Sequence, residues 1–197
     1  LRRNNVDLID GKGVLADLHT VEVAGQTYTA EKILIACGGW PTLPNIPGIE
    51  HAITSNEALD LPELPQRLVI VGGGYIAVEF AGIFGAAGAA VTQIIRGDEV
   101  LRGFDDDVRC FLGDQLVKHG IDLRRASQVR ALDRTNEGLV VTLADGARTI
   151  TADAVMYATG RSPNTRGIGL EDAGVELALN GAVVVDDWNR SSVPSIF

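Results

Sequence analysis

The sequence predicts an α/β fold in three layers, β/β/α, with a parallel sheet, an antiparallel β-meander and helices. Two observations predict it. An apolar run at 68–71 is followed by a glycine cluster, a helical pattern and a second strand at 91–95, which is the order of a βαβ unit. After residue 129 the apolar period changes to two, which is typical of antiparallel strands.

The parallel layer should contain strands at 68–71, 91–95 and 121–123, with helices between them. The first helix follows the glycine cluster, and its apolar residues recur at helical spacing: Ile76, Phe80, Ile83 and Phe84. The second helix begins after Asp105, the expected N-cap residue, and ends at Gly120. Its expected apolar face consists of Val108, Phe111, Leu112 and Leu116.

The antiparallel layer should consist of short strands at 129–134, 139–143 and 148–150, joined by turns that contain glycine. A final buried strand is expected at 155–158. Together with the parallel strands, these segments place one domain at residues 62–158.

The flanks of this domain have a different pattern. Residues 20–23 and 27–30 predict a hairpin, and 32–37 and 182–185 predict further strands. Five prolines between residues 41 and 65 indicate a connection, 41–61, that is interrupted only by a short helix after the T-x-x-E capping box at 54–57. Residues 1–40 and 159–197 are therefore expected to be two pieces of a second domain.

Composition excludes several classes of function. The formal net charge is −9, and no basic run overcomes the resulting field, so neither nucleic acid nor an anionic membrane is an expected partner. No apolar run reaches the roughly 18 residues that span a bilayer. The two cysteines, Cys37 and Cys110, lie far apart, which favours a reducing cytoplasm and predicts that both are buried structural residues. The three histidines form no cluster with ligand or triad spacing.

The glycine cluster carries the clearest chemistry. Gly72-Gly73-Gly74-Tyr75-Ile76-Ala77 has the form G-x-G-x-x-A between a strand and a helix, the context in which a Rossmann-type domain binds a dinucleotide. Gly72 permits the tight turn, Gly74 lets the backbone approach a pyrophosphate, and Ala77 allows close helix packing. The alternative is a glycine turn without a ligand, and the strand–loop–helix–strand context favours the binding loop.

Two arginines indicate which nucleotide is bound. At the end of the second strand, where an acidic residue usually binds the ribose 2′-hydroxyl of NAD, this sequence has Arg96, and Arg102 follows on the same loop. Guanidinium groups suit a 2′-phosphate better than a hydroxyl. The sequence therefore predicts NADP(H), and the alternative is two solvated surface arginines.

Four segments resemble glutathione reductase-type members of the flavin-dependent pyridine nucleotide-disulfide oxidoreductases. They are residues 73–84 and 96–105, the segment Ala-Cys-Gly-Gly-Trp-Pro at 36–41, which resembles A-T-G-G-x-P, and Ala-Thr-Gly-Arg-Ser-Pro-Asn at 158–164, which resembles A-T-G-R-x-P-N. The likeness covers nearly the whole chain.

The resemblance implies an activity and several residue roles. In that family NADPH delivers hydride to FAD, which reduces an active-site disulfide that in turn splits glutathione disulfide. Tyr75 would cover the nicotinamide pocket, and Glu79 would pair with a lysine on the flavin side. Gly160 would add a main-chain contact to the nucleotide, and Arg161 would lie between the nucleotide and flavin sites. The alternatives are a half-buried helix aromatic for Tyr75 and a solvated carboxylate for Glu79.

The chain also departs from the family pattern. It has no C-x-x-x-x-C dithiol, no first G-x-G-x-x-G for FAD and no C-terminal catalytic histidine, and Cys37 replaces a threonine. We therefore expect this chain to bind NADPH without turnover and without retaining FAD, as part of a homodimeric glutathione-disulfide reductase. The alternatives are a related flavoprotein that reduces another disulfide, and a stand-alone nucleotide-binding module.

Overall fold

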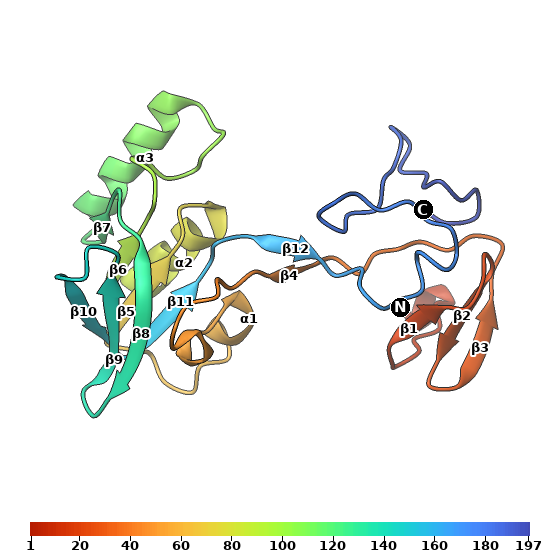
Figure 1. The fold of residues 1–197 in the computed structure, drawn as a ribbon, viewed down its shortest axis with the longest axis horizontal. Helices are drawn as coiled ribbons and strands as arrows, with labels where there is room; N and C mark the ends of the chain where they lie inside the picture. Colours follow the sequence, from red (N-terminus) through yellow and green to blue (C-terminus); the bar gives the residue numbers. More distant parts are fainter. The chain divides into compact units, whose positions relative to one another are not determined.

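The chain forms two compact units. The computed structural model describes residues 1–197, except for the side chain of Arg2. A central unit comprises Pro41–Gly160, and a flanking unit comprises Leu1–Trp40 and Arg161–Phe197 (Figure 1). The central unit is thus inserted between the two sequence segments of the flanking unit.

A parallel four-stranded sheet is the middle layer of the central unit. In spatial order its strands are β11 (Ala154–Tyr157), β5 (Arg67–Val71), β6 (Ala90–Ile94) and β7 (Asp122–Arg124). The chain adds β6 and β7 on one side of β5 and later returns to place β11 on its other side. The strand order therefore reverses between β5 and β11, and the predicted parallel strands are confirmed.

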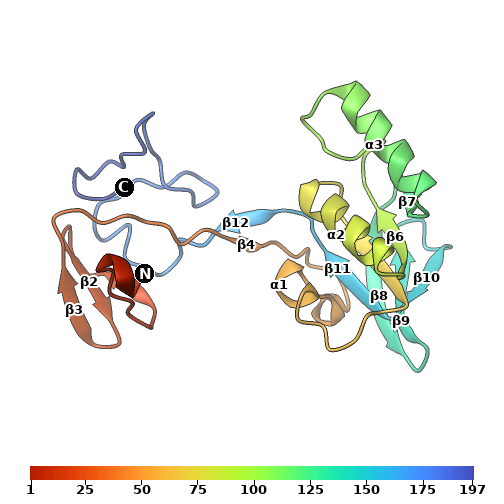
Figure 2. The ribbon, with the colours of Figure 1, turned by 180° about the vertical axis from the view of Figure 1, so that it is seen from behind.

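Helices α2 (Tyr75–Ala86) and α3 (Asp106–Lys118) lie on one face of this sheet (Figures 1 and 2). The short helix α1 (Ser55–Ala58) precedes them and contributes Ala58 to the same core. Side chains of β5 that face the helices pack with the buried face of α2. The principal members of this core are Leu68, Ile70, Ala77, Phe80, Phe84, Val91 and Met156.

An antiparallel sheet covers the opposite face. It consists of β8 (Val129–Thr135), β9 (Gly138–Leu143) and β10 (Thr149–Ala152), in the order β10-β9-β8. Alternate residues of β9 are buried, as a strand with one solvated face requires. The second core contains Val69, Val71, Leu132, Val141 and Val155. The predicted β/β/α layering is confirmed.

Local signals at the helix ends also match the structure. The Asp105 carboxylate accepts hydrogen bonds from the N–H groups of Asp107, at 3.0 Å, and Val108, at 3.3 Å. Gly120 follows α3 with a φ of 87°, which is the left-handed conformation that ends many helices. Thr54 and Glu57 form the predicted capping box at α1.

The expected apolar face of α3 is only partly buried. Leu116 is buried and Leu112 is half-buried, but Val108 is 50% exposed and Phe111 is 66% exposed. The prediction was wrong for these two residues because the sheet contacts a narrower strip of the helix than the apolar pattern suggests.

The flanking unit contains a small antiparallel sheet, ordered β1-β2-β3. Its strands are Gly13–Leu15, Thr20–Val23 and Gln26–Thr29, and a 3-10 turn, η1 (Arg2–Asn4), precedes them. Residues 164–197 pack against it in irregular conformation. The core of this unit contains Leu15, Ile33, Leu170, Val175, Val193 and Ile196. A further pair, β4 (Gly39–Pro41) and β12 (Arg161–Pro163), and a 3-10 turn, η2 (Ile49–His51), complete the chain.

Two predicted strands of the flanking unit do not form. In residues 32–37 only Ile33 makes a bridge, with Ile196, and Leu34 is 72% exposed. In residues 182–185 only Val183 makes a bridge, with Leu177. Each run does hydrogen bond to another segment, Ile33 and Ile35 with residues 195–197 and Val184 with Glu176, but over so short a stretch that only one bridge forms. Both strand predictions were therefore wrong. None of the helices among the described residues is long and apolar enough to cross a bilayer.

An ion pair joins three parts of the central unit. Arg67, at the start of β5, donates from Nε to Asp153, at 3.1 Å, and from Nη2 to the carbonyl of Glu137, at 2.8 Å. The N–H of Arg67 donates to the other oxygen of Asp153, at 2.8 Å. The Arg67 side chain, followed by its N–H, holds the pKa of the Asp153 carboxyl below its ordinary value.

This pair gives a testable pH dependence. Because the pKa of Asp153 is depressed in the folded state, its contribution to stability is present above the unfolded-state pKa and is lost as pH falls through the folded-state pKa. We expect Asp153→Asn to unfold at lower urea concentration than the wild type at pH 7, with the gap closing toward pH 3. Asp133→Asn, which changes an exposed carboxylate on β8, is the control and should show no such gap. A gap that stays constant with pH would contradict the assignment.

Candidate functional site

The glycine loop lies where the order of the parallel strands reverses. Gly72 follows β5 directly, and its N–H donates to Ile94 at 2.9 Å. Ala158, which follows β11, donates its N–H to Val71 at 2.8 Å. In open α/β sheets this reversal point, at the carboxyl ends of the strands, is where a ligand crevice forms.

Gly72 cannot be replaced without strain. Its φ is 145°, which side chains rarely adopt, and a Cβ atom built there would lie 2.3 Å from the carbonyl oxygen of Ala158. Gly74 differs, because its φ is −82° and nothing lies within 4 Å of a Cβ built on it. Gly72 is therefore needed for the turn itself, whereas Gly74 keeps open the space beside the start of α2.

The loop presents unpartnered backbone donors. Gly74 is the N-cap residue of α2, no side chain caps the helix, and its first turn contains no acidic residue. Within the part of the chain that the structure describes, no hydrogen bond uses the N–H groups of Gly73, Gly74 and Tyr75. Free N–H groups and the positive end of the helix dipole make this a suitable position for an anion such as a diphosphate.

The loop that follows β6 is fixed against the glycine loop. The N–H of Leu101 donates to the carbonyl oxygen of Gly73 at 2.6 Å, and a Cβ on Gly73 would lie 3.2 Å from Ile95. Leu101 has a φ of 52°, an unusual value for a leucine. This contact brings the segment that carries Arg96 and Arg102 against the glycine loop, whose free N–H groups suit an anion.

One ion pair and one hydrogen bond hold the arginine-bearing loop in place. Arg125 pairs with Glu99 at 3.1 Å, and the Nε of Arg109 donates to the carbonyl of Val100 at 2.9 Å. By contrast, Arg96 and Arg102 are exposed and have no hydrogen bond or ion pair with any described residue. The loop is thus held by other groups, and these two guanidinium groups stay available for a ligand.

The other residues expected at the site are placed as follows. Ile76 is half-buried and Ala77 fully buried in α2, whereas Tyr75 is 59% exposed and Glu79 is exposed without an ion-pair partner among the described residues. Gly160 accepts a hydrogen bond from the N–H of Thr42 at 2.9 Å. Arg161 belongs to the flanking unit, where its guanidinium donates to the carbonyl of Gly39.

Both cysteines are exposed, so the prediction that they are buried was wrong. Cys110 occupies a part of α3 that the sheet does not cover.

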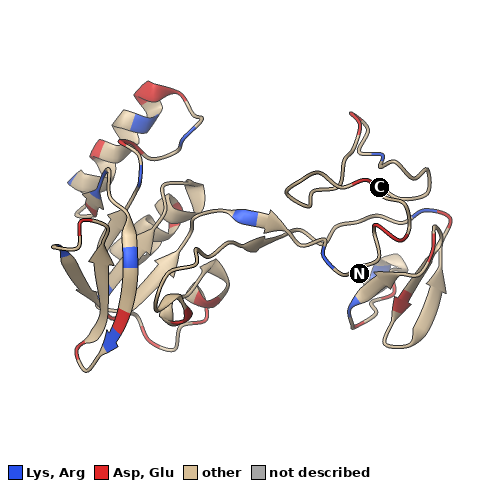
Figure 3. Cartoon of the chain, in the orientation of Figure 1, with Lys and Arg blue, Asp and Glu red and all other residues tan. Residues whose placement is uncertain are grey.

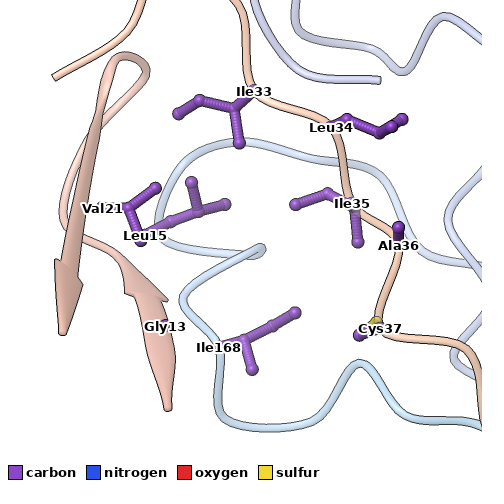
Figure 4. A pocket seen from close by; sticks show the side chains of 9 residues that line it. All are labelled: Gly13, Leu15, Val21, Ile33, Leu34, Ile35, Ala36, Cys37 and Ile168. Atoms are coloured by element: carbon purple, nitrogen blue, oxygen red, sulfur yellow. The ribbon is translucent and has the colours of Figure 1, made fainter. Parts of the chain in front are cut away.

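Cys37 lies at the edge of an apolar pocket in the flanking unit, toward which Leu15, Ile35 and Ile168 point (Figure 4). That pocket contains no charged side chain, and it does not have the donors that a nucleotide phosphate needs. It is lined by Gly13, Leu15, Val21, Ile33, Leu34, Ile35, Ala36, Cys37 and Ile168.

Charged residues elsewhere in the described part of the chain are spread out rather than gathered into a second anion site or a metal site. Basic and acidic residues are interspersed, and acidic residues mark the start of α3 (Figure 3). No group of three or more His, Cys, Asp or Glu residues that could hold a metal ion occurs within the described residues.

The sequence interpretation missed two residues that shape the loop. One is Leu101, whose backbone contact with Gly73 no side-chain pattern would reveal. The other is Gln93, which is fully buried in β6 and donates from Nε2 to the carbonyl of Gly72 at 3.0 Å. The available signal was a glutamine in a strand that the βαβ order predicts to lie inside the sheet.

Comparison with known proteins identifies the family. A sequence model described as pyridine nucleotide-disulphide oxidoreductase matches residues 1–197. The chain belongs to this family. It is 48% identical to a glutathione reductase of Burkholderia cepacia over 193 residues, which cover 98% of this chain and 43% of that protein. It is 44% identical to a trypanothione reductase of Trypanosoma congolense, over 87% of this chain and 36% of that protein. The chain thus spans less than half the length of these oxidoreductases.

Solved structures agree with this assignment. The HOCl-induced flavoprotein disulfide reductase RclA of Escherichia coli is similar with a TM-score of 0.90 and 32% identity, over 98% of this chain and 45% of that one. An engineered water-forming NADPH oxidase, solved with NADPH bound, has a TM-score of 0.79 and 30% identity, over 93% of this chain and 43% of that one. The α/β architecture is therefore that of flavoprotein disulfide reductases.

The two glycines give a prediction on stability. Gly72→Ala should lower the free energy of unfolding by about 3 kcal/mol or more, because the added methyl group meets a backbone carbonyl at an unfavourable φ. Gly74→Ala should cost less than about 1 kcal/mol, because its backbone is extended and its surroundings are open. Urea unfolding of both variants measures the difference. Equal losses would contradict the geometry of the loop.

Proposed function

We propose that the central unit is the NADPH-binding domain of a glutathione reductase-type oxidoreductase. The observation that carries this proposal is the contact between Leu101 and Gly73, at 2.6 Å, which joins the glycine loop and the arginine-bearing loop into one surface. The proposed domain comprises residues 62–158, with 41–61 as a connection and with 1–40 and 159–197 as pieces of an FAD-binding domain.

The glycine loop would hold the diphosphate of the coenzyme. The N–H groups of Gly73, Gly74 and Tyr75 have no acceptor among the described residues. Backbone donors of this kind bind the diphosphate, which NADPH and NADH share, and do not contact the 2′ position at which the two differ. Ala77 has no exposed surface, so α2 approaches β5 closely enough to keep these donors at the strand end. This part of the site would bind NADPH and NADH equally.

Arg96 and Arg102 would supply selectivity for NADPH. Both are exposed and unpaired among the described residues, on a loop that the Glu99–Arg125 ion pair and the hydrogen bond from Arg109 to Val100 hold in place. The similar engineered oxidase supports this assignment, because it binds NADPH and its stated substitutions include two arginines introduced six positions apart, which is also the separation of Arg96 and Arg102. A 2′-phosphate carries the charge that two guanidinium groups would bind.

The full-length protein would be an NADPH-dependent, FAD-containing glutathione-disulfide reductase. When bound, NADPH would supply a hydride, and its two electrons would reach a disulfide by way of FAD. Tyr75, 59% exposed at the start of α2, would cover the nicotinamide, and Glu79, one turn further on, would pair with a flavin-side lysine. Gly160 would add a main-chain contact to the nucleotide, and Arg161 would lie between the two cofactors. We place the full-length enzyme in the cytoplasm as a homodimer.

The sequence contains no C-x-x-x-x-C dithiol that could pass electrons on to a disulfide substrate. The chain alone would therefore bind NADPH without turnover.

A second candidate is reduction of a different disulfide. The 44% identity to a trypanothione reductase is close to the 48% identity to a glutathione reductase, so this part of the sequence favours neither substrate strongly. Steady-state reduction of glutathione disulfide and of trypanothione disulfide by the full-length enzyme distinguishes them. A third possibility, a stand-alone nucleotide-binding module, predicts NADPH binding by a protein that reduces neither substrate.

Isothermal titration of this chain with NADPH and NADH tests the proposal directly. We expect micromolar binding of NADPH, weaker binding of NADH and no flavin absorbance in the purified chain. Failure to bind either nucleotide would overturn the assignment of the central unit.

The arginines give a prediction on selectivity. Arg96→Ala or Arg102→Ala should weaken NADPH binding by about ten- to a hundredfold, because each charge-assisted hydrogen bond contributes about 1.5 to 3 kcal/mol. NADH binding should hardly change. Arg134→Ala, which removes an exposed arginine from β8, is the charge-matched control and should leave both affinities unchanged. Equal losses for the two nucleotides would contradict the role of the arginines.

A further inference from the structure

Gln93 is out of place in the packing of β6. The strand alternates between the two cores, and the neighbours of Gln93 on its own face, Val91 and Ile95, lie in the helix-facing core. Gln93 has no exposed surface, and its Oε1 has no hydrogen-bond partner among the described residues. A buried amide with an unsatisfied oxygen is costly, and an aliphatic side chain would avoid that cost.

The other end of the same amide contacts the glycine loop. Its Nε2 donates to the carbonyl oxygen of Gly72 at 3.0 Å. A trans peptide is planar, so its C=O and N–H point in opposite directions. A Gly72 carbonyl held toward buried Gln93 therefore turns the N–H of Gly73 away from the sheet, to the side where the loop has no internal acceptor.

We propose that Gln93 is a positioning residue, which aims the Gly73 N–H at the diphosphate of the bound nucleotide by holding the Gly72 carbonyl. Gln93 itself does not touch the ligand. The inference rests on the proposed function and adds to it a side chain beneath the loop. Glycine can rotate over a wide range of φ, so a glycine-rich loop needs a fixed contact of this kind to keep its donors oriented.

Removing the amide separates this role from simple packing. In Gln93→Leu the Gly72 carbonyl loses its donor, while the unsatisfied Oε1 is also removed, so the thermal midpoint should stay close to that of the wild type. Affinity should fall by about three- to tenfold, which corresponds to the loss of one hydrogen bond. The fall should be the same for NADPH and NADH, because both carry the diphosphate.

Tyr157→Phe is the matched control. The Tyr157 hydroxyl is the other buried side-chain atom without a partner among the described residues, and this side chain lies in the core between the two sheets. The variant removes a buried polar atom without touching the loop, so nucleotide affinity should not change. In amide NMR spectra, Gln93→Leu should shift the Gly73 and Gly74 resonances of the free protein, and Tyr157→Phe should not.

Several outcomes would overturn the inference. If wild-type protein binds both nucleotides and Gln93→Leu binds them equally well, Gln93 does not position the loop. A loss confined to NADPH would assign the effect to the arginine loop. Should Gln93→Leu and the more nearly isosteric Gln93→Met both unfold, hydrogen exchange of the wild-type Gln93 side-chain amide decides. We expect the Gln93 side-chain amide protons to exchange slowly in the free protein and more slowly with NADPH bound. Rapid exchange would refute the contact with Gly72. Absence of binding by the wild type is instead a failure of the proposed function.

Discussion

The contact between the Leu101 N–H and the Gly73 carbonyl is the interaction on which the rest of the site depends. It joins loops that leave successive parallel strands, β5 and β6, at the same edge of the sheet. Leu101 adopts a positive φ to make it, a conformation that persists only where the surroundings determine it. The two residues before Leu101 are both held: Glu99 pairs with Arg125, and the carbonyl of Val100 accepts a hydrogen bond from Arg109. The loop therefore has a defined path, although the two arginine side chains that it carries are exposed.

The proposed site would divide recognition between backbone and side chains. Backbone N–H groups at the start of α2 suit the diphosphate that all such dinucleotides share, whereas the guanidinium groups of Arg96 and Arg102 suit a phosphate that only one of them carries. This division also fits the charge of the chain, which is −9 overall. The general field repels anions, so attraction must come from local donors within a few ångströms. The uncapped helix end and the unpaired arginines provide such donors side by side.

Two residues at the glycine loop, Gln93 and Gly72, reduce local stability, unlike the core residues around them. Gln93 introduces an unsatisfied oxygen into a sheet that is otherwise packed with aliphatic side chains, and Gly72 adopts a backbone conformation that excludes a Cβ atom. Both features oppose stability locally, and Gln93 on β6 donates to the Gly72 carbonyl just after β5, beside the point where the strand order reverses. Departures of this kind are expected where a protein holds a binding surface in one geometry, because the surrounding layers supply the stability.

The sequence by itself determined the features that depend on near neighbours. The strands at 68–71 and 91–95, the capping box at Thr54 and the helix limits at Asp105 and Gly120 all follow from patterns within a few residues. Tertiary structure decided what depends on distant partners. Residues 32–37 and 182–185 are apolar enough for strands, but each meets a partner segment over so few residues that a single bridge forms, and the two cysteines are exposed because nothing packs over them. Pairing and burial are properties of two segments at once, so no local pattern specifies them.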